Sequence, residues 1–169
     1  MLAQLGFFLS IAFSGIAWGI VTGHYIWPAL RLRQRDDALR PLLIVHSFRF
    51  IGLAFLVPGV VSPDLPTAFA HSAAYGGIVA AILALLSLVS LPSELGVLMA
   101  WIFNLWGSAD LLNGFYQANA TGLTPGQLGA AYFIPTVMVP LLPITHGLAF
   151  RILLHPQKAS AMREIRQPA

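Results

Sequence analysis

The stretch LLIVHSFRFIGLAFLVPGVV, residues 42–61, decides the fold class, because only His46 and Arg49 are ionisable in a run of 20 residues. An α-helix of this length rises about 30 Å, which matches the hydrocarbon core of a bilayer. Four further apolar segments, at residues 3–28, 68–91, 95–116 and 128–153, are at least as long. The sequence therefore predicts an all-α, integral membrane bundle of five transmembrane helices, in a single domain covering residues 1–169.

The composition supports the same class. Of the 169 residues, 57% are hydrophobic and 9% are charged, and the mean hydropathy is +0.78. Soluble domains carry about 25% charged residues, so this chain is expected to have the lipid bilayer as its main solvent. The chain has no cysteine, which excludes disulfides, thiolate metal sites and iron–sulfur clusters.

The basic residues predict how the chain is threaded. They flank apolar segments, in the first loop and at the C-terminal end: Arg31, Arg33, Arg35 and Arg40, then Arg151, Lys158, Arg163 and Arg166. Short cytoplasmic loops are enriched in lysine and arginine, and five spans place both groups on one side. We therefore expect the N-terminus to lie outside and a basic tail at 154–169 to lie in the cytoplasm. The expected location is the cell membrane, of the bacterial inner-membrane type. The same distribution explains the net charge of +3 without a nucleic-acid partner.

Three ionisable residues of the second and fifth segments fall at similar depths. At 1.5 Å per residue, His46 and Arg49 lie roughly 6 and 10 Å from the predicted cytoplasmic edge, and His146 also lies roughly 10 Å from it. The sequence predicts a cluster of these three side chains, with Asn104 near the midplane able to join Arg49. A charge at a helix centre costs about 2.5–3.5 kcal/mol on insertion scales, which indicates function. The alternative is that Arg49 extends to the headgroups.

A second polar cluster is predicted in the outer half of the membrane. Asp110, Asn113 and Gln117 are spaced i, i+3 and i+7, so they share one face of a helix. His71 and Tyr75, near the outer end of the third segment, reach the same depth. We therefore expect His71, Tyr75, Asp110 and Asn113 to lie together. Asp110 is the strongest candidate for function, because an aspartate inside a membrane needs a partner or a water-filled cavity.

Prolines and glycines mark two further features. Pro135, Pro140 and Pro143 each remove a backbone donor from the fifth segment, which favours an opened helix lining a cavity over a simple packing kink. Small residues recur every four positions in the first segment, at Gly15, Gly19 and Gly23. Such a stripe lets another helix approach closely, either within the monomer or in a homodimer.

Three functional interpretations remain open. The first is a protein that binds a small molecule or lipid in an intramembrane polar cavity, as a transporter or accessory subunit; its candidate ligand-binding residues are Arg49, His46, His146, Asp110, Asn113, Asn104 and Tyr75. The second is a b-type haem carrier ligated by His46 and His146. The third is a membrane enzyme that uses Asp110 or His71 as general acid or base on a lipidic substrate. The identity of a ligand or cofactor does not follow from the sequence.

Overall fold

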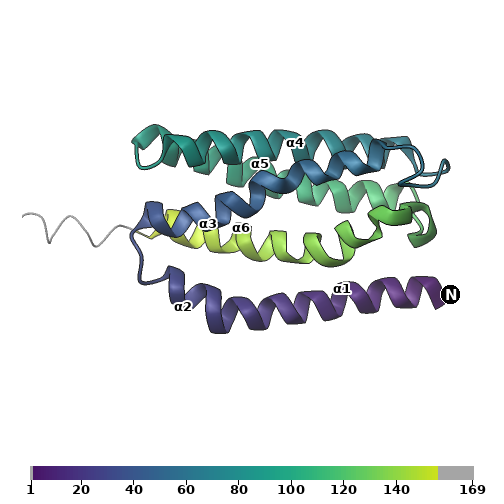
Figure 1. Ribbon diagram of the computed structural model, residues 1–169, viewed down its shortest axis with the longest axis horizontal. Coiled ribbons are helices and arrows are strands. Elements are labelled where there is room, and N and C mark those ends of the chain that lie inside the picture. The colour runs from purple at the N-terminus through teal and green to yellow at the C-terminus, as the bar shows by residue number, and fades with distance from the viewer. Residues whose placement is uncertain (1, 156–169) are drawn as a thin grey trace, which may run out of the picture.

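A computed structural model describes residues 2–155 of the chain, and the regular elements of this part are all helices joined by short loops (Figure 1). Its elements, in chain order, are α1 (Leu2–Val21), the π-helical turn η1 (Thr22–Ile26), α2 (Trp27–Leu30), α3 (Arg35–Ser47), the 3₁₀-helix η2 (Phe48–Leu56), α4 (Thr67–Ser90), α5 (Glu94–Ala120), the 3₁₀-helix η3 (Pro125–Tyr132), the π-helical turn η4 (Ile134–Met138) and α6 (Val139–Leu154). All but the first two residues of the predicted tail lie outside the described residues.

Within residues 2–155, five helical stretches are long and apolar enough to cross a membrane: Leu2–Leu30, Arg35–Leu56, Thr67–Ser90, Glu94–Ala120 and Ile134–Leu154. They confirm the expected number of apolar helices. The second stretch begins at Arg35 rather than at residue 42, so the first loop is shorter than predicted and Arg35 and Arg40 lie in a helix. Asp36 and Asp37 lie in the first turn of α3, where a negative charge stabilises the positive end of the helix dipole.

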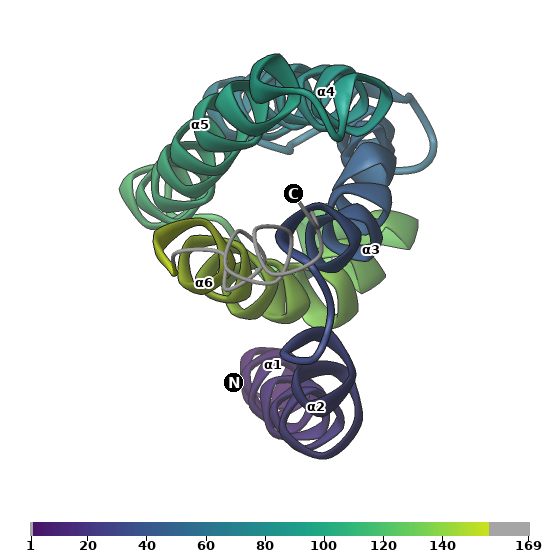
Figure 2. The same ribbon diagram turned by 90° about the vertical axis from the view of Figure 1, so that its left-hand side faces the viewer.

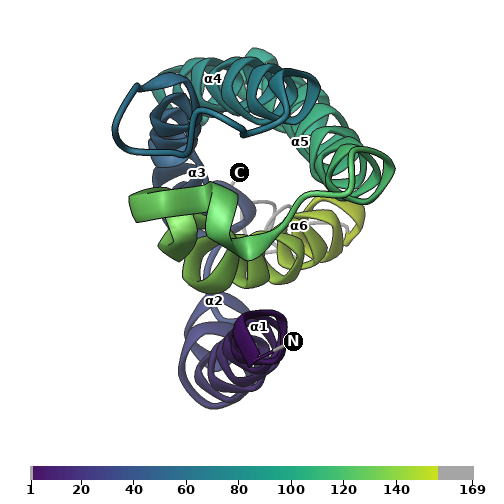
Figure 3. The ribbon, with the colours of Figure 1, turned by 90° about the vertical axis from the view of Figure 1, so that its right-hand side faces the viewer.

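Four of these stretches form a ring, and the first stretch, Leu2–Leu30, lies outside it. Figures 2 and 3, which look along the helices, show α3, α4, α5 and α6 around the ring, with α1 and α2 beside it. Each neighbouring pair in the ring is in contact, while α1 contacts α6, η3, η4 and the adjoining η1. Accordingly, α1 buries none of its side chains.

Glycines bring η2 and α4 into backbone contact. A Cβ added to Gly52 would lie 2.7 Å from the carbonyl oxygen of Ala73, and one added to Gly77 would lie 2.8 Å from the carbonyl oxygen of Arg49. Neither glycine can therefore be replaced by a larger residue without moving a helix. This close approach holds the backbone of Arg49 against α4.

Two apolar cores occupy opposite ends of the ring. One, at the end where α3 begins (the Arg35 end), includes Leu39, Leu43 and Phe103; the other, at the end covered by η3 (the Pro125 end), includes Phe55 and Leu128. The main buried polar residues lie between these cores. The middle of the bundle is therefore where a polar site is placed.

Candidate functional site

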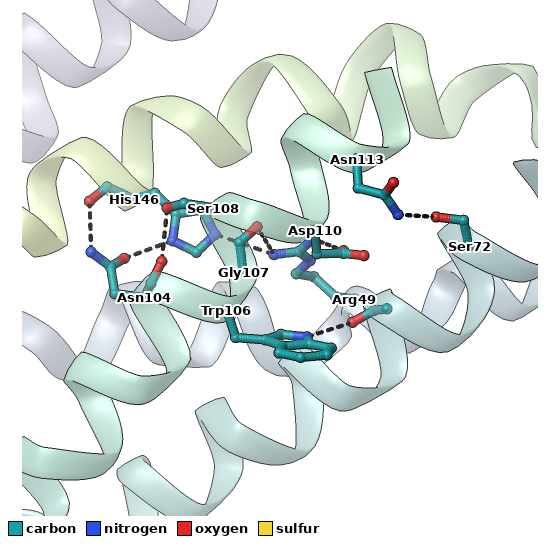
Figure 4. A network of polar contacts seen from close by, with 10 residues as sticks. Arg49, Ser72, Asn104, Trp106, Gly107, Ser108, Asp110, Asn113 and His146 are labelled. Atoms are coloured by element: carbon teal, nitrogen blue, oxygen red, sulfur yellow. Dashed lines mark hydrogen bonds and ion pairs between the residues drawn. The ribbon is translucent and has the colours of Figure 1, made fainter. Parts of the chain in front are cut away.

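The site is centred on Arg49, the second residue of the 3₁₀-helix η2 and the first whose side chain is buried (Figure 4). Its guanidinium donates to Asp110 Oδ2 at 2.6 Å, to the carbonyl oxygen of Gly107 at 3.2 Å and to His146 Nε2 at 3.1 Å. The side chains of Arg49 and Asp110 are only 6% and 10% exposed. A charge so deeply buried requires a partner, and Asp110 supplies it. Arg49 therefore points into the ring and does not extend along its helix toward the Arg35 end of the bundle.

Glycines on α4 and α5 make room for this ion pair. A Cβ on Gly76 would overlap the Asp110 carboxyl group, with Cγ only 2.5 Å away. A Cβ on Gly107 would lie 2.5 Å from His146 Cε1 and 2.8 Å from an Arg49 terminal nitrogen. Sequence reasoning missed both glycines. Glycine weakens a helix interior, so its presence there was a signal that something approaches the backbone closely.

The hydrogen bonds assign the tautomer of His146. Arginine can only donate, so His146 Nε2 must accept from Arg49. His146 Nδ1–H then donates to Asn104 Oδ1 at 2.6 Å, and Asn104 Nδ2 donates back to the His146 carbonyl oxygen at 3.3 Å. Asn104 is thus linked to Arg49 through His146, rather than by a direct bond. The imidazole is a neutral positioning group between the amide and the guanidinium.

His46 lies against His146, as the predicted depths indicated. The two ring centroids are 4.2 Å apart, and Phe103 packs against both rings. Thr145 Oγ1 donates to the carbonyl oxygens of the preceding turn, so His46 Nε2 donates to Thr145 Oγ1 at 2.9 Å. Sequence reasoning did not predict this role of Thr145.

This geometry does not fit a haem. Axial imidazoles bind from opposite faces of the macrocycle, which must pass between their rings. The 4.2 Å between the centroids of His46 and His146 leaves no room for it, and both Nε2 atoms are already hydrogen-bonded. Within residues 2–155 there is also no group of three or more His, Asp or Glu that could hold a metal ion.

The predicted outer cluster does not form as a unit. Asp110 bonds Arg49 instead, and Asn113 Nδ2 donates to Ser72 Oγ at 2.6 Å. His71 and Tyr75 pack together on the exposed face of α4, with ring centroids 5.7 Å apart. Gly76 is the position of α4 that contacts Asp110, and His71 lies five residues before it. Positions 71 and 76 therefore face directions about 140° apart around the helix. Matching depth therefore did not bring His71 to the aspartate.

A cavity of about 950 Å³ extends from the ion pair toward the Pro125 end. Its walls come from helices of the ring and from α1, which contributes Gln4, Phe7, Phe8, Ile11 and Gly15. Arg49 and Asp110 are the only charged residues among the described residues that line it. Most of the remaining lining is apolar and includes Phe7, Phe55, Phe69, Phe115, Leu128 and Leu142. Pro135, in the π-helical turn η4, and Pro140 and Pro143, in α6, also line it. The cavity interpretation of these prolines is the one that the geometry supports.

The glycine stripe of α1 has no partner within the monomer. A Cβ on Gly15, Gly19 or Gly23 would meet nothing within 4 Å. The stripe therefore does not pack closely against another helix of the same chain, which was one of the two expectations. A homodimer through these residues stays a prediction.

Comparison with known proteins identifies the family. A family model described as "Domain of unknown function (DUF8737)" matches residues 6–154, which include every residue of the site. Comparisons with curated proteins and with solved structures gave no match. The match covers all five apolar helices and the described part of the chain almost completely. The chain therefore belongs to the DUF8737 family.

Proposed function

We propose that this protein is a multi-pass protein of the cell membrane that binds a small molecule or lipid in the cavity beside Arg49 and Asp110. In this proposal the N-terminus is outside, the Pro125 end is the outer end, and the ring crosses the bilayer. The protein acts as a carrier of the ligand or as an accessory subunit that presents it.

The surface of the bundle supports placement in a membrane. Large apolar side chains point outward on every long helix: Phe13 on α1, Phe50 on η2, Val89 on α4, Leu112 on α5 and Val137 before α6 are all at least 42% exposed. Monomeric soluble proteins rarely expose contiguous apolar patches of more than a few hundred Å². Hydrocarbon is the solvent that this surface fits.

One observation carries the binding proposal: a buried ion pair forms the polar end of an otherwise apolar cavity. A buried ion pair is weak support for stability, because apolar residues of similar volume often do as well or better. Ionisable groups inside a membrane are therefore a default indication of function. Apolar walls with a few convergent polar groups are also the usual composition of a small-molecule site.

The other two interpretations gain nothing from the geometry. A haem does not fit between His46 and His146. A general acid–base pair of His71 and Asp110 would need the two side chains to face one site, whereas His71 lies on the exposed face of α4.

The test is native mass spectrometry of protein released from mild detergent. We expect a retained non-covalent mass in the wild type. Arg49→Leu removes the polar end of the cavity, and Gly114→Phe fills the cavity from a position where a Cβ meets nothing within 4 Å. Both variants should lose the retained mass.

The matched control is Arg33→Leu, which removes an exposed arginine from the loop before α3 and should keep the retained mass. A circular dichroism melt establishes that each variant is folded. An adduct that is retained equally by folded Arg49→Leu and Gly114→Phe would rule out this cavity as the binding site.

A further inference from the structure

Resting on the proposed function, we infer that the ligand is an electrically neutral amphiphile whose head group has a carbonyl or hydroxyl oxygen next to a hydroxyl donor. A monoacylglycerol has this chemistry. A phosphate-headed lipid and an amine-headed lipid do not.

The charge of the site is already balanced. Arg49 and Asp110 are 2.6 Å apart and sum to zero, and the other described residues of the lining are uncharged. A phosphate would therefore enter beside the Asp110 carboxylate with no additional cation to compensate it. An ammonium group would meet Arg49 in the same way. Charges interact strongly where water is excluded, so both ionic head groups are disfavoured.

The hydrogen-bonding capacity of the pair defines the complementary head group. A guanidinium has five N–H donors. Both hydrogens of one terminal nitrogen of Arg49 are used by Gly107 and His146, and one hydrogen of the other is used by Asp110. Its Nε–H and one remaining terminal hydrogen make no hydrogen bond to the described residues, and neither does Asp110 Oδ1. The site thus offers donors on Arg49 beside an acceptor on Asp110.

These free groups belong to side chains that are at least nine-tenths buried and that line the cavity. A ligand that covers these groups without bonding them would leave them buried and unpaired, which costs about 1–3 kcal/mol for each and more for charged groups. An oxygen of the ligand that accepts from Arg49, next to a hydroxyl that donates to Asp110, satisfies both at once. This requirement selects against purely apolar ligands.

The rest of the cavity fits an elongated apolar body. Its volume of about 950 Å³ is at the upper end of the range of about 300–1,000 Å³ for small-molecule sites. Away from the ion pair, the few polar side chains in the lining include Gln4, Asn119 and Thr124, all near the Pro125 end. A single acyl chain can therefore extend from the ion pair toward that end along phenylalanine, leucine and proline side chains.

Three probes with the same 18-carbon chain test the inference: monoolein, oleyl phosphate and oleylamine. Each is titrated into delipidated full-length protein in one detergent, and binding is measured by native mass spectrometry. We expect the wild type to bind monoolein about tenfold or more tightly than either charged probe.

Two variants should redirect this selectivity. Asp110→Asn leaves the Arg49 charge uncompensated, so the preference should shift at least about tenfold toward oleyl phosphate. Arg49→Gln should shift it toward oleylamine by the same reasoning. The matched controls, Asp64→Asn and Arg33→Gln, change exposed residues of the loops and should leave the selectivity unchanged.

The outcomes separate the two proposals. A wild type that binds oleyl phosphate or oleylamine as tightly as monoolein, with binding still blocked by Gly114→Phe, overturns the neutral-head inference and leaves cavity binding intact. A wild type that binds none of the probes saturably and retains no native ligand overturns both. Melting curves in the same detergent check the folding of each variant, and the wild-type selectivity decides the matter for any variant that does not fold.

Discussion

Replacing Gly76 by alanine is the sharpest test of how the ion pair is built. The added methyl group would overlap the Asp110 carboxyl group, and Asp110 Cγ would be 2.5 Å away. Rotation of the carboxylate does not relieve this contact, because Cγ lies on the rotation axis. Either α4 moves away from α5 or Asp110 leaves Arg49. The matched control is Gly114→Ala in the interior of α5, where the new methyl group meets nothing within 4 Å.

The expected magnitude follows from two opposing effects. Alanine is preferred to glycine in a helix interior by about 1 kcal/mol, which stabilises both variants. Breaking a buried ion pair by removing one partner costs about 3–5 kcal/mol. We therefore expect Gly76→Ala to lower the free energy of unfolding by about 2–4 kcal/mol. Gly114→Ala should raise it by up to about 1 kcal/mol.

The assay is unfolding by sodium dodecyl sulfate in mixed micelles, followed by circular dichroism, with a double-mutant cycle. In an Asp110→Ala background the carboxylate is gone, so adding Gly76→Ala should no longer destabilise the protein. The helix preference of alanine is present in both backgrounds and cancels, so the coupling energy between the two sites should be about 3–5 kcal/mol. Additive effects, or a Gly76→Ala variant as stable as Gly114→Ala, would refute the contact between Gly76 and Asp110 and the tight packing of α4 on α5.

Two further predictions concern the buried amide and the threading. Asn104→Leu removes the acceptor for His146 Nδ1–H and should lower the free energy of unfolding by about 1–3 kcal/mol in the same detergent titration. The control Asn113→Leu removes an exposed hydrogen bond and should cost less. Equal costs would contradict the bonded tautomer of His146. Because the chain has no cysteine, introduced single cysteines report its orientation in the membrane. Asp64→Cys should react with a membrane-impermeant maleimide in intact cells, and Gln34→Cys should react only after permeabilisation. The reverse pattern would invert the proposed topology.

Composition and periodicity were enough to predict the helices. Apolar runs of at least 20 residues separated by turn residues correspond to the five apolar helices of the structure, because helix length and hydropathy are local properties of the chain. The approach of His46, Arg49 and His146 was also predicted, because axial depth follows from the helical rise. The rotation of each helix about its own axis, which decides the side chains that face a neighbouring helix, did not follow from the sequence.

The error at Asp110 shows where local reasoning ends. Arg49 and Asp110 were assigned to separate clusters in the two halves of the membrane, yet they form one ion pair. The assignment assumed that the second helix begins near residue 42, whereas it begins at Arg35. At 1.5 Å per residue, this start places Arg49 about 21 Å along its helix, and Asp110 lies about 24 Å along α5, which begins at Glu94. The two residues therefore lie at similar depths, and the long arginine side chain spans the remaining distance.

The sequence by itself thus determined that this is a helical chain with five apolar helices that carry a few ionisable residues, because these properties depend on residue type and on the length of each apolar run. Only the tertiary structure decided which of those residues meet. Gly76 and Gly107 admit Asp110, Arg49 and His146 into one network, and the prolines beside η4 line a cavity next to it. Such contacts depend on the rotation and close approach of helices that are distant in sequence, which are set by packing of the whole bundle.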